Sequence, residues 1–103
     1  MPVSLVWTPQ AREDLVEIYA WIAQENLSAA ENLWDGIQSK IVALNIHPRL
    51  GVRRSDIRPS ARILIHGAYL VLYETVPDGD EGRIDRVEIV RIVDGRRNLK
   101  GLF

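Results

Sequence analysis

Three apolar runs in the last third of the chain place the strongest constraint on its fold. Residues 61–65 and 68–76 are separated by a two-residue connection that contains Gly67, and such a connection is typical of a β-hairpin. A third run, residues 83–93, lies between a turn-rich segment and an Asp-Gly turn signal. The pattern predicts an antiparallel meander of three strands, followed by a basic tail.

The beginning of the chain predicts one strand followed by a helix. Residues 3–7 are β-prone. Thr8 is a suitable N-cap, and Pro9 fits the first helical position, where no backbone N–H is needed. We therefore expect a helix over residues 9–26. Its apolar side chains recur at helical spacing and form a predicted buried stripe that consists of Ala11, Leu15, Ile18, Tyr19 and Ile22.

A second helix is predicted to begin at a capping-box pattern, Ser28 to Glu31. It ends at His47, because the residue before Pro48 resists helical backbone angles. The connection between the helices is so short that they must form an antiparallel hairpin. Residues 49–60 follow as a basic loop. The predicted buried stripe of this helix consists of Ala30, Leu33, Trp34, Ile37, Ile41 and Leu44.

These elements predict an α+β fold with the order β-α-α-β-β-β, in which a helical hairpin packs on a small antiparallel sheet. A chain of 103 residues has the size of a single domain. Tyr69 and Tyr73 point to one face of the sheet, and Leu70 and Leu72 point to the other. The pattern leaves open which face meets the helices. Because both faces are apolar, something, such as a partner, is expected to cover the second face.

Composition excludes several classes of site. The chain has no cysteine, so it has no disulfides and no thiolate metal ligands. It also has no recognisable metal or phosphate-binding motif, and we expect no metal and no cofactor. No apolar run approaches the length of a membrane span, and the N-terminus lacks a signal pattern. We therefore expect a cytoplasmic protein with no membrane contact.

Charge is unevenly distributed along the chain. Residues 1–46 contain six acidic and two basic side chains, whereas residues 47–103 contain eight acidic and eleven basic ones. This asymmetry suggests a contact surface on the basic half. Arg96 and Arg97 are its leading candidates, because a charged pair at the end of a strand is not needed for packing.

Two further arginines, Arg62 and Arg91, lie within the predicted strands and have two possible roles. They either support the basic tail in binding or are solvated cross-strand partners of Glu74 and Glu88. Trp21 lies beside the apolar stripe of the first helix, where it either contacts a partner, which we expect, or packs at the edge of the core.

The order and spacing of four segments resemble the ParE branch of the ParE/RelE toxin superfamily. The segments are VWTPQAREDLVEIYAWIA near the start, HPRLGVRR after the second helix, the pattern R-x-L-x-x-x-x-Y-x-V-x-Y from Arg62 through Tyr69 to Tyr73, and VEIVRIVDGRRNL at the end. The resemblance covers essentially the whole chain. One departure is Asn98, at a position where the family often has Asp.

The resemblance implies a toxin of a bacterial type II toxin–antitoxin system that shares its fold with RelE ribonucleases but inhibits DNA gyrase by binding it. A cognate antitoxin would neutralise the toxin. We expect a ParD-like partner, a ribbon-helix-helix dimer with a flexible acidic and apolar tail. DNA would be contacted only through this antitoxin.

The resemblance and the residue pattern together predict two sets of binding residues. The gyrase-binding set consists of Arg96, Arg97, Leu102 and Phe103, with support from Arg91 or Arg62. The antitoxin-binding set consists of Trp21, Leu27 and Arg58.

A ribosome-dependent mRNA endonuclease of the RelE type is the alternative. That chemistry needs groups that transfer protons as well as cations that stabilise a phosphate. The only lysines are Lys40 and Lys100, and the tail after Arg97 contains neither Tyr nor His. We therefore predict no catalytic residue. If catalysis did occur, His47 and His66, the latter interpreted as a turn residue, would be the first candidates. An inactive relative that serves only as an interaction partner is the third hypothesis.

Overall fold

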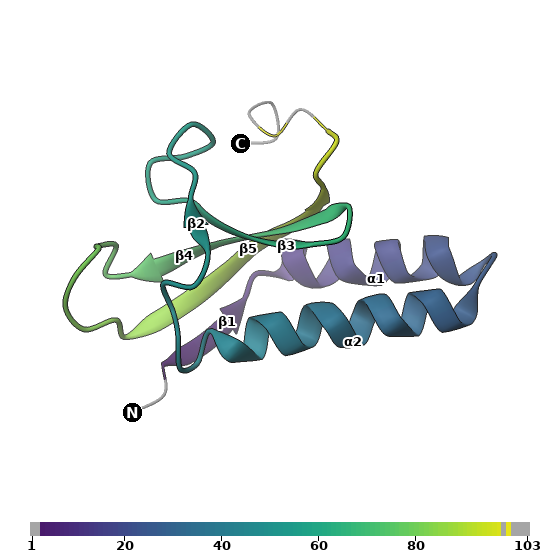
Figure 1. The fold of residues 1–103 in the computed structure, drawn as a ribbon, viewed down its shortest axis with the longest axis horizontal. Helices are drawn as coiled ribbons and strands as arrows, with labels where there is room; N and C mark the ends of the chain where they lie inside the picture. Colours follow the sequence, from purple (N-terminus) through teal and green to yellow (C-terminus); the bar gives the residue numbers. More distant parts are fainter. Residues whose placement is uncertain (1–2, 98, 100–103) are drawn as a thin grey trace.

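The computed structural model describes residues 3–97 and residue 99. Two antiparallel helices cover one face of a five-stranded sheet (Figure 1), so the predicted α+β class and the predicted helical hairpin are confirmed. The elements in chain order are β1 (Ser4–Trp7), α1 (Pro9–Ala23), α2 (Leu27–Ala43), β2 (Val52–Arg53), β3 (Arg62–His66), β4 (Tyr69–Val76) and β5 (Arg86–Asp94).

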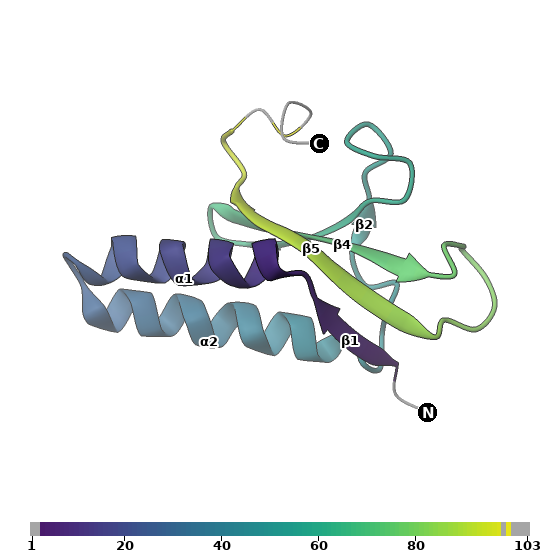
Figure 2. The ribbon, with the colours of Figure 1, turned by 180° about the vertical axis from the view of Figure 1, so that it is seen from behind.

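The sheet is mixed, whereas the sequence predicted an antiparallel one. Its strand order is β1-β5-β4-β3-β2, and the last three long strands form the predicted antiparallel meander. β1, however, lies beside β5 in parallel, with Ser4 opposite Arg86 and Trp7 opposite Ile89 (Figure 2). Both helices separate β1 from the meander, so no short hairpin forces β1 to run antiparallel.

A second correction concerns the segment predicted to be a basic loop. Val52 and Arg53 form the short edge strand β2, which pairs with Ile63 and Arg62 of β3. Two residues are too few to show an alternating pattern, so the sequence carried no signal for this strand.

The start of α1 is as predicted, but the turn between the helices is not. The Thr8 hydroxyl accepts a hydrogen bond from the backbone N–H of Ala11 at 3.1 Å. α1 ends at Ala23 rather than near Asn26, because the Asn26 side chain is the N-cap of α2 and accepts a hydrogen bond from Ala29 at 2.9 Å. The capping box predicted at Ser28 is therefore wrong, and both helices meet at a tight turn.

The helix-facing core shows which side of the sheet the helices cover. Val71 and Tyr73 of β4 pack against the apolar stripes of both helices, together with Ile89 and Ile92 of β5. Ile89 and Ile92 are three residues apart and still share one face, because the pairing shifts at Val90 and leaves one extra residue in β5. This bulge explains why alternation in the last strand was ambiguous. The buried members of this core are Ala11, Leu15, Ile37, Ile41, Leu44, Leu64, Val71, Tyr73, Val87, Ile89 and Ile92.

The second apolar face of the sheet is covered by the chain itself. Ile57 and Ala61, which precede β3, pack with Leu70 and Leu72 of β4, and Leu99 adds to the cluster from the C-terminal side. Figure 1 shows the segment before β3 above the sheet, opposite the helices. The second face is therefore covered, as expected, and the covering element is a loop of the chain itself rather than a partner.

Candidate partner-binding site

An open cleft of about 330 Å³ lies between α1 and the C-terminal end of β5. It is lined by Arg91, Arg96 and Arg97, which the sequence assigned to the target, and by Trp21, which it assigned to the antitoxin. The structure thus places both predicted classes of binding residue at one site. The remaining lining side chains include Gln10, Asp14, Glu17, Ile18, Tyr69 and Asp94.

The floor of this cleft is organised by Asp14, whose side chain is only 6% exposed. Its carboxylate accepts hydrogen bonds from Nε and Nη2 of Arg91, at 2.7 and 3.1 Å, and from the backbone N–H of Ile92 at 2.9 Å. The pairing of β1 with β5 ends at Trp7 opposite Ile89, so β1 offers no acceptor to the backbone N–H of Ile92. This N–H donates to the Asp14 carboxylate instead.

This arrangement corrects one sequence interpretation. Arg91 is not a solvated cross-strand partner of Glu74 or Glu88, one of the two roles considered for it, because it pairs with Asp14 on α1 and the hydrogen bond raises the pKa of its guanidinium. Asp14 itself is buried against the sheet. The Thr8 hydroxyl donates to the Val90 carbonyl at 2.9 Å, so the start of α1 is anchored at the bulge of β5.

The rim of the cleft presents exposed groups. Arg96 is held by Asp94, with Nε to Oδ1 at 2.9 Å and Nη2 to Oδ2 at 2.5 Å, although its side chain is 79% exposed. These hydrogen bonds lower the pKa of Asp94 from 3.8 to about 2. Arg97 is exposed and forms no ion pair within the described residues. Trp21, on α1, is 73% exposed. The rim therefore offers an oriented guanidinium, a second guanidinium and an indole.

The structure does not bring Arg62 to this cleft. Arg62 is only 6% exposed and pairs with Asp80 at 3.1 Å, so its alternative role as a solvated partner of Glu74 is wrong. Glu74 lies instead within 3.5 Å of Arg58, a predicted antitoxin-binding residue, on the loop that covers the second face of the sheet. Leu27, at the start of α2, is 56% exposed.

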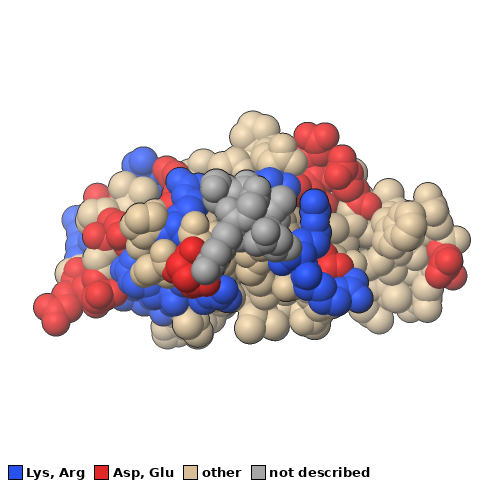
Figure 3. Space-filling model, turned by 90° about the horizontal axis from the view of Figure 1, so that it is seen from above, with Lys and Arg blue, Asp and Glu red and all other residues tan. Residues whose placement is uncertain are grey.

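Leu102 and Phe103 lie outside the described residues. Figure 3 looks onto the face opposite the helices and shows Lys and Arg side chains gathered in its left and central parts, with Asp and Glu side chains at both ends and along the upper edge. Basic side chains are therefore prominent on this face, and acidic side chains lie around them.

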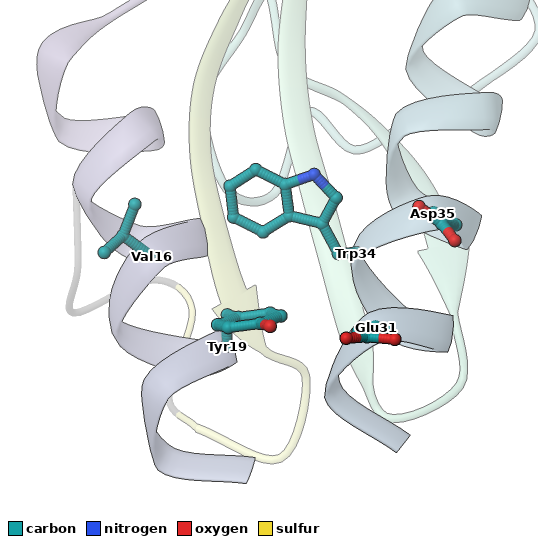
Figure 4. Close-up of a pocket in the computed structure, with 5 residues that line it drawn as sticks. All are labelled: Val16, Tyr19, Glu31, Trp34 and Asp35. Carbon is teal, nitrogen blue, oxygen red and sulfur yellow. The ribbon is translucent and has the colours of Figure 1, made fainter. Parts of the chain in front are cut away.

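A second concave surface, which the sequence analysis did not identify, lies between the two helices. It is an open groove of about 580 Å³ lined by Val16, Tyr19, Glu31, Trp34 and Asp35. Figure 4 shows the Trp34 indole extending from α2 toward α1 above Tyr19, and the two rings meet edge to face with centroids 5.5 Å apart. Trp34 was predicted to be core, but it is only partly buried and forms the apolar floor of this groove. The sequence signal for this groove was Val16, an apolar residue that lies off the predicted stripe of the first helix. Its side chain is 55% exposed in the structure.

Among the described residues, no His or Lys lines the cleft, since His47 is exposed elsewhere and His66 packs beside Gly36 of α2. The described part of the chain contains no group of His, Asp and Glu residues that could hold a metal ion. None of its helices is long and apolar enough to cross a membrane.

Comparisons with known proteins agree on one family. The model of the family described as the ParE toxin of the type II toxin-antitoxin system parDE matches residues 5–99. Toxin ParE3 of Caulobacter vibrioides is 34% identical over 87 residues, which are 84% of this chain and 80% of that protein. A solved structure described as the chromosomal ParDE TA system from P. aeruginosa superposes with a TM-score of 0.71 at 22% identity, covering 89% of this chain and 95% of that one. This last likeness shows the fold alone. The chain therefore belongs to the ParE family, the toxins of type II toxin–antitoxin systems.

Proposed function

We propose that this toxin inhibits DNA gyrase by binding it, without catalysis, in the cytoplasm. The observation that carries the proposal is the rim at the end of β5, where Arg96 is oriented by Asp94 and stands exposed beside Arg97. A guanidinium that is already oriented loses little freedom when it binds a carboxylate or phosphate of a partner.

The chemistry of the cleft favours binding over proton transfer. The two carboxylates that meet its arginines, Asp14 and Asp94, are each engaged by a guanidinium. The low pKa of Asp94 keeps it ionised at neutral pH, so it positions a cation and does not serve as a general acid. Arg91, below the rim, is held by Asp14 and supports the same cationic surface.

Substitution of the exposed pair tests this proposal. The double variant Arg96→Ala, Arg97→Ala is expected to lose inhibition of gyrase supercoiling, with at least a tenfold higher concentration needed, while its thermal unfolding stays unchanged. Arg83→Ala is the matched control, because Arg83 is 88% exposed near the opposite end of β5 and pairs only with Asp85. A double variant that inhibits gyrase at the wild-type concentration would sink the proposal.

The reaction class needs a separate assay. The antitoxin-free protein should leave mRNA intact on programmed ribosomes, as read by primer extension. Toxin-dependent cuts inside codons would establish the RelE-type endonuclease instead. A protein that neither cuts mRNA nor inhibits gyrase would be the inactive relative.

We further infer that a cognate, ParD-like antitoxin covers the same cleft. Its ribbon-helix-helix dimer would contact DNA, and its flexible acidic and apolar tail would pack on Trp21 and Leu27, two large apolar side chains that α1 and α2 leave exposed. Because Trp21 and Arg96 line one cleft, an antitoxin bound there would exclude gyrase.

Calorimetry with the purified antitoxin tests this inference. Trp21→Asp is expected to weaken the complex at least tenfold, or about 1.4 kcal/mol. Val42→Asp is the control, because Val42 is 56% exposed on α2 but lines none of the surfaces described above. Unchanged affinity in Trp21→Asp would remove this residue from the interface.

A further inference from the structure

A second basic site lies beside the connection that leads from β4 into β5. Residues 77–82, the acidic part of this connection, fold back onto two arginines of β2 and β3. Nη2 of Arg53 donates to Asp78 and to Asp80, both at 3.0 Å, and Nη2 of Arg62 donates to the same Asp80 oxygen at 3.1 Å. The connection leads into the start of β5, whereas the cleft lies at the C-terminal end of that strand, and neither arginine lines the cleft.

Arg62 is a buried cation whose hydrogen bonding is incomplete. The residue is only 6% exposed, and Nη1 donates to the Gly51 carbonyl at 3.2 Å. Its Nε is buried and has no partner, the one side-chain atom in this state among the described residues. Nε and Nη2 form the edge of a guanidinium that binds a carboxylate through two parallel hydrogen bonds. Asp80 uses only one of the two donors on this edge.

The present occupants of the site are held weakly. The Asp80 side chain is 78% exposed and that of Asp78 is 40% exposed, and ion pairs with exposed carboxylates contribute little to stability. None of residues 77–82 is buried, and the apolar anchor of the connection, the buried Ile84, lies beyond this segment, next to β5. Gly82 adopts a φ of 85°, a backbone conformation that favours glycine, at the point where the connection turns.

The remaining attachment of the connection is through its backbone. Nε of Arg49 donates to the Gly79 carbonyl at 3.0 Å, and Nη2 donates to the Gly82 carbonyl at 2.9 Å. These hydrogen bonds hold the backbone near Arg53 and Arg62 without using a carboxylate. The two aspartates can therefore be exchanged while the connection stays attached.

We propose that Arg53 and Arg62 form a docking site for an acidic peptide segment of a partner, and that Asp78 and Asp80 are built-in occupants which such a segment displaces. A peptide fits better than a free phosphate, because two carboxylates separated by one residue already fill the site. This inference does not depend on gyrase as the target, since none of these residues lines the cleft at the other end of β5.

Asp78 and Asp80 compete with an added acidic peptide for Arg53 and Arg62, and this competition lowers the apparent affinity of the protein for the peptide. A tethered competitor on a short connection acts at an effective concentration in the millimolar range. The wild-type protein should therefore bind an acidic peptide weakly. Removal of the two carboxylates should increase the affinity by at least tenfold. Asn at both positions keeps an oxygen that accepts hydrogen bonds from the guanidiniums, so the fold is maintained.

Fluorescence anisotropy tests the proposal with a labelled peptide of the connection itself, Pro-Asp-Gly-Asp-Glu-Gly, titrated with the full chain. The variant Asp78→Asn, Asp80→Asn is expected to bind at least tenfold more tightly than wild type. Glu81→Gln is the matched control, because it removes the same charge from an exposed side chain of the same connection that forms no ion pair with the described residues. It should change the affinity by less than twofold.

Two additional arms define the ligand. Arg53→Ala, added to the double variant, should return the affinity to the wild-type level. A peptide with Asn in place of both aspartates should show no gain, and inorganic phosphate should not displace the acidic peptide at equal concentration. No gain in the double variant, an equal gain in Glu81→Gln, or displacement by phosphate would each overturn the proposal.

If the double variant does not fold, Asp78→Asn alone should bind the peptide at least threefold more tightly than wild type, and no gain would overturn the proposal.

Discussion

The hydroxyl of Tyr73 accepts a hydrogen bond from the backbone N–H of Gly51 at 2.7 Å. The same hydroxyl donates to the Pro48 carbonyl at 3.0 Å, and burial raises the pKa of Tyr73, so the donating proton is retained. Tyr73 is fully buried in the centre of β4. One core side chain therefore fixes the path of the segment that leads from α2 into β2.

Tyr73→Phe should destabilise the protein by about 1–3 kcal/mol, because it leaves the buried Gly51 N–H without an acceptor. Urea unfolding followed by circular dichroism measures this change. Tyr69→Phe is the control, since Tyr69 is only partly buried and its hydroxyl has no hydrogen bond with the described residues. Equal stability of Tyr73→Phe and wild type would show that the hydroxyl contributes nothing.

Gly51→Ala should cost about 2–3 kcal/mol through overpacking. A Cβ at this position would lie 2.5 Å from Cε1 of Tyr73 and 2.7 Å from the Ile63 carbonyl oxygen, and a backbone atom cannot move aside cheaply. Gly79→Ala is the control, because its Cβ would meet only the Glu81 carbonyl at 3.6 Å. Differential scanning calorimetry should show a lower Tm for the first variant, and equal Tm values would contradict the prediction.

Asp14→Ala should reduce the free energy of unfolding by about 2–4 kcal/mol, since it leaves a half-buried guanidinium and a backbone N–H without their acceptor. Glu13→Ala, on the exposed side of the same helix, should change it by less than about 0.5 kcal/mol. Chemical denaturation distinguishes the two variants. Similar values for both would mean that Asp14 does not hold α1 on β5.

His66 should make the protein less stable in mild acid. Burial against α2, and then the nearby Lys40, lower the pKa of His66 below its ordinary value of 6.5. The unfolded state therefore takes up a proton first, and the stabilising contribution, present above pH 6.5, is lost as pH falls through the folded-state pKa.

Urea unfolding between pH 7.5 and 5 checks this expectation. His66→Gln should lose part of the pH dependence over this window because it cannot titrate. His47→Gln is the control, because it replaces an exposed histidine and leaves His66 in place. Identical pH profiles for His66→Gln and wild type would rule out the contribution of His66.

Arg96→Ala should raise the pKa of Asp94 from about 2 toward 3.8, because the Arg96 side chain is the main cause of the shift. Titration of the carboxyl ¹³C resonance by NMR measures this change, and Arg83→Ala should leave it unaltered. The stability contribution of this pair is present above pH 3.8 and is lost as the pH falls toward 2. A low pKa that persists in Arg96→Ala would mean that Arg96 is not held in place by Asp94.

Much of the fold could be predicted because its signals are local. The Thr8-Pro9 start of α1, the turn at Gly67 and the end of β5 before Gly95 depend on the backbone preferences of a few adjacent residues. The members of both helix stripes that are buried in the core, such as Leu15 and Ile37, follow from spacing within one element, whereas Tyr19 and Ile22 are only half-buried. The exposure of Arg96 and Arg97 could also be predicted, because a strand that ends releases the residues after it.

Only the tertiary structure decided the partners of the arginines within the sheet. Asp14 and Arg91 are 77 positions apart, and their contact depends on where β1 ends and on the bulge at Val90. Asp80 reaches Arg62 because a connection, not a paired strand, folds back over β3. By itself, the sequence determined every element except β2, the order of these elements and the arginine-rich half, since periodicity and turn chemistry act over a few residues. Which charges meet was decided by register and packing, because groups far apart in the chain become neighbours only after the layers assemble.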